Sequence, residues 1–224
     1  MLLTFLENCG LYLQSGGCGL LVDAPNRENT LFDGVSEEAT ESMAAGVPPY
    51  DTLCGLIFTH KHSDHYDKRR VRRIAESREE LPIFAPNGAT PPTGSLQIGV
   101  FQIRYFTVPH SGAEFSGEYH RTFLISDGSA TLYVSGDAAW DAEPHETILQ
   151  NTTLSAAVWN PNFLSHEDGR RLLKRAPVNF INHLPIRRPD NLGVLRKCLT
   201  SKKRHMRELE NAYLVENLPF SYEI

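Results

Sequence analysis

The sequence contains no apolar run that approaches the roughly 18 to 20 residues of a membrane-spanning helix. Residues 1–6 are apolar, but they lack a basic start and a long apolar middle, so we expect no secretory signal peptide. The four cysteines form neither a CxxC pair nor a regular framework; they are Cys9, Cys18, Cys54 and Cys198. We therefore expect a soluble, cytoplasmic protein with reduced and mostly buried thiols, although Cys9 and Cys18 could also face each other across a hairpin.

Positive charge is scarce relative to negative charge. The 22 Lys and Arg residues are outnumbered by 27 Asp and Glu residues, which gives a net charge of −5 and a pI near 6.0. This balance argues against a surface built as a whole to hold nucleic acid, while a local basic patch remains compatible with it. No internal repeat or low-complexity segment is present, and 224 residues with 41% hydrophobic content can form a sizeable core. We expect a single domain over residues 1–224.

Short strands that end in turn residues dominate the pattern. The expected strands cover residues 2–6, 11–14, 20–23, 56–58, 81–85, 122–126, 131–135, 155–159 and 178–181, with a further hairpin over 96–108 around Gly99. Helical spacing or capping residues predict helices over 36–45, 67–80 and 167–175, and most of 190–216. In the 67–80 helix, we expect the many basic residues to face water.

Four imidazole or carboxylate groups stand within six residues, directly after the apolar run Leu56-Ile57-Phe58; they are His60, His62, Asp64 and His65. A strand alternates its side chains, so His60 and His62 can leave one face together, and a turn can swing Asp64 and His65 toward a second point. Without a cation, such a cluster would repel itself or stay unsatisfied. One short segment can therefore serve two adjacent metal ions.

Three further polar groups arrive at the ends of predicted strands. His110 follows the 96–108 hairpin, Asp137 follows the strand over 131–135, and His183 follows the strand over 178–181. Asp23 ends an earlier strand in the same way, where it could cap a turn or orient another residue. These groups are well placed to point into one cleft.

The pattern HxHxDH, followed by His110, Asp137 and His183, resembles the metallo-β-lactamase superfamily. The resemblance implies an α/β fold, an αββα sandwich of two mixed β-sheets packed face to face, with helices outside and metals at one edge. It implies that His60, His62 and His110 hold one metal and that Asp64, His65 and His183 hold a second. Asp137 would bridge the two metals, and Asp23 would orient ligands by hydrogen bonding. The motifs run from position 23 to 183, so the resemblance covers most of the chain.

A dinuclear centre of this kind supports hydrolysis. Zinc lowers the pKa of bound water to roughly 7 and polarises the bond under attack. We therefore expect a metallo-hydrolase with two divalent ions, zinc in the first place, with iron or manganese also compatible with these ligands. Asp64, Asp137 and His183 are the expected catalytic residues.

The substrate is less constrained by the sequence. Asp137 stands where antibiotic-hydrolysing members carry cysteine, and Tyr66-Asp67-Lys68-Arg69 lacks the glycine-rich continuation of the thioester hydrolases. The chain looks more like the compact branch with a lactonase and phosphodiesterase or ribonuclease Z-like relatives. No protruding arm precedes His110, which favours a small molecule, and the basic stretches 68–73 and 202–207 favour an anionic one. We expect a small anionic ester, lactone or phosphodiester, with no membrane partner.

Three alternatives stay open at this point. The same metals could serve a nuclease acting on nucleic acid, the scaffold could carry an iron-dependent oxidoreductase, or the chain could bind metal without catalysis. Among the remaining histidines, His145, His166 and His205 are interpreted as structural or surface groups, and His120 as structural in preference to a cleft residue. Ser111 and Asn182 flank expected ligands and are candidate substrate contacts. The aromatic residues Tyr66, Trp140 and Trp159 are expected in the core.

Overall fold

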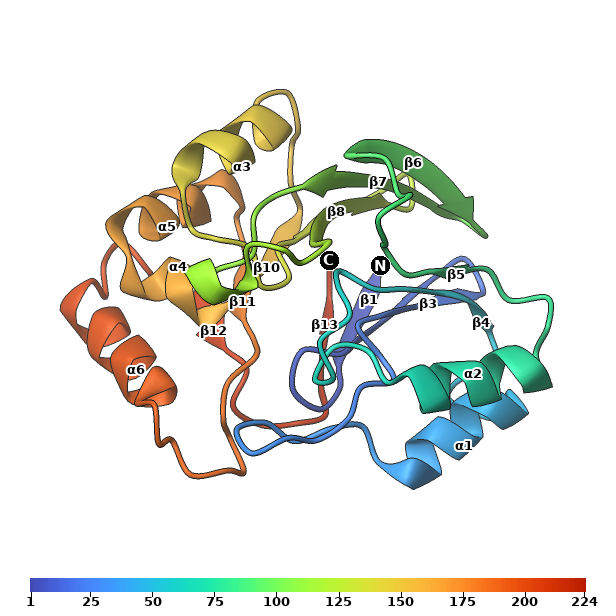
Figure 1. The fold of residues 1–224 in the computed structure, drawn as a ribbon. Coiled ribbons are helices and arrows are strands. Elements are labelled where there is room, and N and C mark those ends of the chain that lie inside the picture. Colours follow the sequence, from blue (N-terminus) through green and yellow to red (C-terminus); the bar gives the residue numbers. More distant parts are fainter.

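Thirteen strands form two β-sheets that pack face to face in the computed structural model, which describes residues 1–224 (Figure 1). The first sheet contains, in spatial order, β13 (Phe220–Glu223), β1 (Leu2–Phe5), β2 (Leu11–Ser15), β3 (Cys18–Val22), β4 (Leu53–Ile57) and β5 (Ile83–Phe84). The second contains β12 (Ala212–Leu214), β11 (Asn179–Ile181), β10 (Ala156–Trp159), β9 (Thr131–Val134), β8 (Arg121–Ser126), β7 (Phe101–Thr107) and β6 (Thr93–Ile98). Both sheets are mixed. In the first, β3, β4 and β5 run parallel, and in the second, β9 to β12 do.

Helices cover the outer face of each sheet. The first sheet is covered by α1 (Glu37–Ala45) and α2 (Lys68–Ser77), and the second by α3 (Ala142–Leu149), α4 (Pro161–Ser165), α5 (Glu167–Leu172) and α6 (Val194–Arg204) (Figure 1). Two short 3-10 helices, η1 (Ala113–Phe115) and η2 (Leu173–Arg175), complete the structure. The layers are therefore αββα, which confirms the predicted fold class. None of the helices has the length and apolar character needed to cross a membrane.

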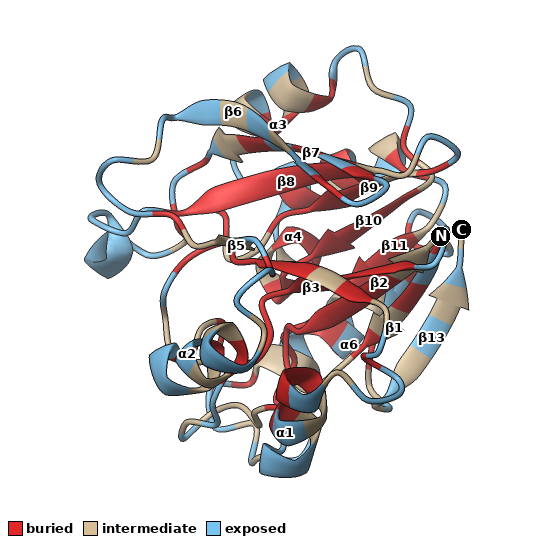
Figure 2. Cartoon of the chain, turned by 90° about the vertical axis from the view of Figure 1, so that its right-hand side faces the viewer, coloured by how far each residue is buried: buried red, intermediate tan, exposed pale blue.

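Three apolar clusters hold the layers together. The central cluster draws buried residues from both sheets, and the other two fill the spaces between each sheet and its helices. Phe5 of β1 and Phe180 of β11 meet across the central layer with ring centroids 4.9 Å apart. The buried strands of both sheets face one another in Figure 2, so one core joins the two halves of the chain. All four cysteines are free.

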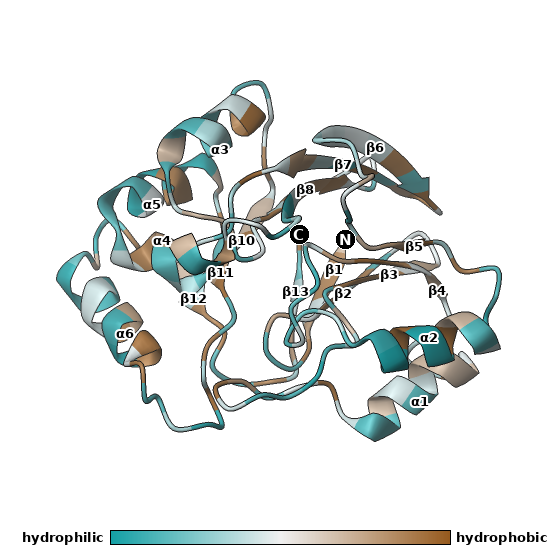
Figure 3. Cartoon of the chain, in the orientation of Figure 1, coloured by the Kyte–Doolittle hydropathy of each residue, from teal (hydrophilic) through white to brown (hydrophobic).

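The predicted helices α1 and α2 form because their local signals agree with their packing. Ser36 caps α1 by accepting a hydrogen bond from the Ala39 amide, and Gly46 ends it with a φ of 63°. Asp67 caps α2, and the helix buries Val71 and Ile74 while its hydrophilic face turns outward (Figure 3).

The prediction of a mostly helical 190–216 segment was wrong. The helix spans only Val194–Arg204, and the chain then returns to add β12 parallel to β11. Leu209 and Ala212 are fully buried on this return, so packing against the second sheet prevails over the helical pattern. The expected strand over 81–85 is likewise reduced to the two residues of β5. The terminal strand β13, which was not predicted, pairs with β1.

Candidate metal centre

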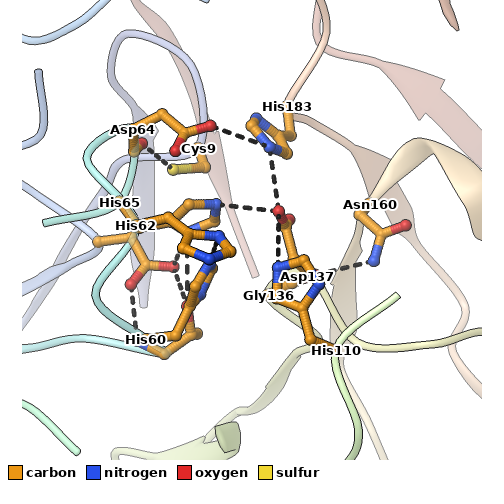
Figure 4. Close-up of polar contacts among 12 residues, drawn as sticks. Cys9, His60, His62, Asp64, His65, His110, Gly136, Asp137, Asn160 and His183 are labelled. Carbon is orange, nitrogen blue, oxygen red and sulfur yellow. Dashed lines mark hydrogen bonds and ion pairs between the residues drawn. The ribbon is translucent and has the colours of Figure 1, made fainter. Parts of the chain in front are cut away.

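The seven predicted ligands lie together at one edge of the sandwich, in the loops that follow strand ends (Figure 4). The segment from His60 to His65 follows β4, while His110, Asp137 and His183 follow β7, β9 and β11. The expectation that His60 and His62 leave one face of a strand was wrong, because β4 already ends at Ile57. The loop beyond it brings the two rings together instead.

The side chains form two adjoining groups. In the first, Nε2 of His60 lies 3.0 Å from Nδ1 of His62, and ligand atoms of both lie within 4.8 Å of one on His110. In the second, Asp64 Oδ2 lies 3.7 Å from His183 Nε2. Asp137 stands between them: its Oδ2 is 3.3 Å from Nε2 of both His65 and His183, and 3.6 Å from Nε2 of His110. The Asp137 carboxylate therefore lies within reach of histidines from both groups.

Hydrogen bonds to Nδ1 orient four of the five imidazoles. His60 Nδ1 lies 3.0 Å from Thr59 Oγ1, and His65 Nδ1 lies 2.9 Å from Asp23 Oδ2. His110 Nδ1 is 2.6 Å from the Ser111 carbonyl, and His183 Nδ1 is 2.5 Å from Asn8 Oδ1. When each Nδ1 donates, the Nε2 lone pair faces the centre, which is the tautomer that a metal ligand needs.

Asp23 lies beside the predicted ligands, as the sequence motif implied. Its carboxylate accepts hydrogen bonds from the Thr59 amide at 2.7 Å and the Thr59 hydroxyl at 2.8 Å, in addition to its contact with His65. It is buried and has a φ of 52°, a left-handed conformation that is uncommon outside glycine. His183 shares this conformation with a φ of 59°. Backbone strain of this kind is typical of functional sites.

Several residues around the centre were not predicted. Besides orienting His183, Asn8 donates from Nδ2 to the Asp64 carbonyl at 3.0 Å. Glu118 Oε1 lies 3.4 Å from His62 Nε2. Asn160 donates to the carbonyls of both Gly136 and Ala138 at 2.9 Å and so holds the loop that carries Asp137. These contacts join residues far apart in the chain, and no local motif marks them.

Position 136 needs a glycine, because the backbone conformation and the neighbouring side chains leave no room for a Cβ. Its φ is 53°, and an added Cβ would stand 2.7 Å from both the His120 Nε2 and the Thr59 Cγ2. Only glycine lets the chain pass there and turn Asp137 into the centre.

Cys9 also lies at the second group, with its sulfur within 4.8 Å of ligand atoms on His65 and His183. Its thiol donates to the Asp64 carbonyl at 3.0 Å. Burial raises the pKa of Cys9 to about 12, so the thiol stays protonated at neutral pH. In this arrangement it is a hydrogen-bond donor to the loop that carries Asp64.

The protonation of His60, His110 and Asp137 suits cation binding. His65 differs: burial acts to lower its pKa, but the neighbouring Cys9, Asp137 and Asp23 outweigh it and raise that pKa well above its usual value. Burial lowers the pKa of His60 well below its usual value and lowers that of His110, so both rings are neutral at pH 7. Burial acts to raise the pKa of Asp137, but the neighbouring His183 and His65 outweigh it and hold that pKa well below its usual range. Neutral imidazoles and an ionised carboxylate are the forms that coordinate zinc.

Three buried polar atoms at the centre have no hydrogen-bond partner in the protein: Nε2 of His65, Nε2 of His110 and Oδ1 of Asp137. Leaving such atoms unpaired costs free energy, about 1 to 3 kcal/mol each. All three belong to predicted ligands and face the same space. The residues present therefore fit divalent cation binding, with nitrogen and oxygen donors of the kind that zinc accepts.

A cleft of about 570 Å³ opens over this centre. Its walls include His62, Asp64, His110, Asp137 and His183, and its apolar sides come from Leu31, Phe32, Phe115, Leu192 and Val194. Ser111 lines the cleft, as expected of a substrate contact. No lysine or arginine lines it.

Other expected contacts lie elsewhere. The prediction that Asn182 contacts substrate was wrong: it is buried and donates to the Cys9 carbonyl at 3.3 Å. His120 is buried behind His60 and His110, with Nδ1 on the Val108 carbonyl at 3.0 Å, so its structural interpretation holds. Trp159 is in the core, as predicted, whereas Trp140 is only partly buried and stacks on His166 with ring centroids 3.8 Å apart.

The basic residues of α2 do not form a rim around the cleft. Arg73 and Arg70 pair with Glu37 of α1, and Arg72 pairs with Glu76. Arg72 and Arg73 face solvent and the neighbouring helix, which agrees with the solvated face predicted for this segment, whereas Arg70 is mostly buried and donates to the Asn26 and Val35 carbonyls.

The sequence matches no protein-family model, and it matches no curated protein. Three solved structures resemble the chain over 100% of its length and 99% of theirs. The metallo-β-lactamase fold protein YhfI from Bacillus subtilis has a TM-score of 0.68 at 18% identity. An isothiocyanate hydrolase from Delia radicum gut bacteria has a TM-score of 0.69 at 15% identity, and a possible metal-dependent hydrolase from Veillonella parvula has 0.74 at 14% identity. The chain therefore has the metallo-β-lactamase fold, as its ligand motif predicted.

Proposed function

We propose that this chain is a hydrolase with a dinuclear zinc centre that cleaves a small anionic ester, lactone or phosphodiester. The observation that carries the proposal is that seven donor side chains converge from four separate loops. Three of these side chains, His65, His110 and Asp137, have buried polar atoms without a protein partner. The likeness to structures named as hydrolases supports the same class of reaction.

Each ligand has a role in this proposal. His60, His62 and His110 would hold one cation, Asp64, His65 and His183 would hold the other, and Asp137 would contact both. Divalent cations bound there would supply an activated water and polarise the bond under attack. Asp23, Thr59 and Asn8 keep the imidazoles in the required tautomer through the Nδ1 contacts, so the donors are in place before substrate arrives.

The cleft supports a small substrate with an apolar part. Its volume of about 570 Å³ is typical of small-molecule sites. The Phe32 ring lies 4.0 Å from the ring of His183, and the Phe115 ring lies 4.7 Å from that of His110, so both aromatic walls reach the centre. Because no lysine or arginine lines the cleft, the cations are the groups that attract a negatively charged substrate.

The test is the substitution Asp137→Ala, with Asp141→Ala as its control. Asp141 is an exposed aspartate four positions later whose side chain makes no capping hydrogen bond. We expect Asp137→Ala to lose bound metal and to reduce turnover by more than about 100-fold, while circular dichroism shows a retained fold. Asp141→Ala should match the parent protein.

The assay combines elemental analysis with chromogenic phosphodiesters, phosphomonoesters, lactones and thioesters. Unchanged metal content and turnover in Asp137→Ala would reject the site. Two equivalents of iron with oxidative turnover would replace the hydrolase by an oxidoreductase, and hydrolysis of RNA that falls steeply with salt would replace the small substrate by nucleic acid.

A further inference from the structure

A second pocket, lined by basic residues, lies on the outer side of the second sheet, where α4, α5 and α6 meet. It measures about 570 Å³, and its lining contains four cationic side chains, those of Arg170, Arg196, Lys197 and Arg204. The rings of His166 and His205 line it as well, and no carboxylate or apolar side chain does. This composition is unusual for a protein whose net charge is −5.

The four cations of this basic pocket have no acidic partner. None of them forms an ion pair within 4.0 Å, whereas the neighbouring Arg171 and Arg175 pair with Asp168 and Glu146. The nearby Asp190 accepts hydrogen bonds from the backbone amides of Leu195 and Arg196, so its carboxylate is engaged at the start of α6. Four like charges that gather without neutralisation repel one another, and an anion would relieve that repulsion.

The helix that carries most of these charges is fixed in orientation. Cys198 is fully buried on the inner face of α6, and Ser201 donates to the Leu164 carbonyl of α4 at 2.6 Å. Arg196 and Arg204 stand eight residues apart, about two turns, so they lie along one side of the helix. Figure 3 shows α6 mainly in hydrophilic colours, with apolar residues at its start. The cations are thus presented by an anchored helix.

The lining indicates the class of ligand. Guanidinium groups bind phosphate through paired N–H donors, and ammonium groups add a point charge. The absence of apolar lining gives no place for a hydrophobic group, and four positive charges exceed what a single carboxylate would balance. The arginines Arg70, Arg72 and Arg73 of α2, on the first sheet, are paired with Glu37 and Glu76 and do not extend the basic pocket. A compact ligand therefore fits better than a long polymer.

We propose that the basic pocket binds a compact anion that carries two or more phosphate groups. This site goes beyond the proposed function, since it uses none of the metal ligands. It adjoins the cleft nonetheless: Pro161, Asn162 and Val194, at the starts of α4 and α6, line the cleft, and later residues of the same helices line the basic pocket. Occupancy of one is therefore placed to influence the other.

The experiment titrates inorganic tripolyphosphate into the full-length protein at low salt by isothermal calorimetry. The protein is used in its parent form and as Asp137→Ala, so that phosphate binding at the metal centre is separated from binding at the basic pocket. We expect saturable 1:1 binding that persists in Asp137→Ala. Adding Arg196→Gln and Arg204→Gln together should weaken it by at least about tenfold, since each removes a charge-assisted hydrogen bond.

The matched control is the pair Lys68→Gln and Arg69→Gln, which removes the same charge from exposed, unpaired positions of α2. It should leave the affinity within about twofold at fixed salt. Equal weakening in both double variants, or no binding in Asp137→Ala, would overturn the proposal. Adenosine triphosphate is titrated for comparison. If the pocket is built for a nucleotide and not for a free oligophosphate, adenosine triphosphate should bind more tightly than tripolyphosphate. A single-stranded RNA that binds more than tenfold tighter than tripolyphosphate, increasingly with length, would show a nucleic-acid surface instead.

Discussion

Asn8 is the residue on which the second half of the candidate metal centre depends. Its Oδ1 lies 2.5 Å from His183 Nδ1, and its Nδ2 donates to the Asp64 carbonyl at 3.0 Å. One side chain therefore holds two ligands that come from loops far apart in the sequence. Asn8 also adopts a φ of 59°, which asparagine tolerates better than most residues.

Asn8→Ala should weaken the metal site formed by Asp64, His65 and His183 by about 10- to 100-fold, because His183 loses the acceptor that fixes its tautomer. The site around His60 should keep its affinity. Elemental analysis after dialysis against graded chelator should then show a stoichiometry that falls from two ions to one. Asn191→Ala, at an exposed asparagine, is the control. Two ions retained with unchanged affinity in Asn8→Ala would contradict this role.

At the residue scale, the sequence allowed prediction of the donors and of Asp23, but not of the other groups that orient them, Asn8 and Thr59. His60, His62 and His65 are recognisable because they are close together in the chain, and His110, Asp137 and His183 because each follows a strand. Asn8 and His183 are 175 positions apart, so their contact depends on the packing of the two sheets. Asn182 was assigned wrongly because its place beside a ligand did not reveal which way its side chain points.

The elements were predictable where local signals decide them. In α1 and α2, capping residues and apolar spacing agree, and both helices form. By contrast, α4 has five residues, and Pro144 interrupts the usual helical composition in the first turn of α3. The terminal strand β13 forms only because β1 is there to pair with it. These elements depend on partners supplied by the rest of the fold.

His145 of α3 makes the packing of this helix against β9 sensitive to pH. Its Nδ1 lies 2.6 Å from the Tyr133 hydroxyl and its Nε2 lies 2.8 Å from the Ala139 carbonyl, so the neutral ring accepts from one and donates to the other. Burial lowers the pKa of His145 to about 4. The unfolded chain, with an ordinary histidine pKa near 6.5, therefore binds a proton that the folded chain does not.

The contribution of neutral His145 to the free energy of unfolding should be fully present above pH 6.5 and should be lost as the pH falls toward 4. Between pH 7 and pH 5, the free energy of unfolding should decrease by roughly 2 kcal/mol on this account. Urea denaturation of the parent protein and of His145→Gln at several pH values measures it, because the variant should show a shallower decrease. His205→Gln, outside this network, should keep the parent slope. Identical slopes for the parent and His145→Gln would rule the assignment out.

Across the whole molecule, the candidate centre joins the two halves of the sandwich. His60, His62, Asp64 and His65 follow a strand of the first sheet, while His110, Asp137 and His183 follow strands of the second. The central apolar cluster also spans both sheets, so cations bound at the centre would act across the same interface as the core. A ligand that binds the folded chain alone stabilises it. Cations bound at this centre would do so by holding the two sheets together at their edge.

Removal of metal should therefore lower the melting temperature of the whole chain in one transition. At a metal concentration 1,000 times the dissociation constant, binding contributes about 4 kcal/mol, which corresponds to a shift on the order of 10 °C for a chain of this size. Differential scanning calorimetry with and without a chelator measures the shift, and excess zinc should restore it. In Asp137→Ala, the chelator should have little effect, because the carboxylate between the two groups is gone. A parent protein that melts at the same temperature with and without chelator would show that no cation links the sheets.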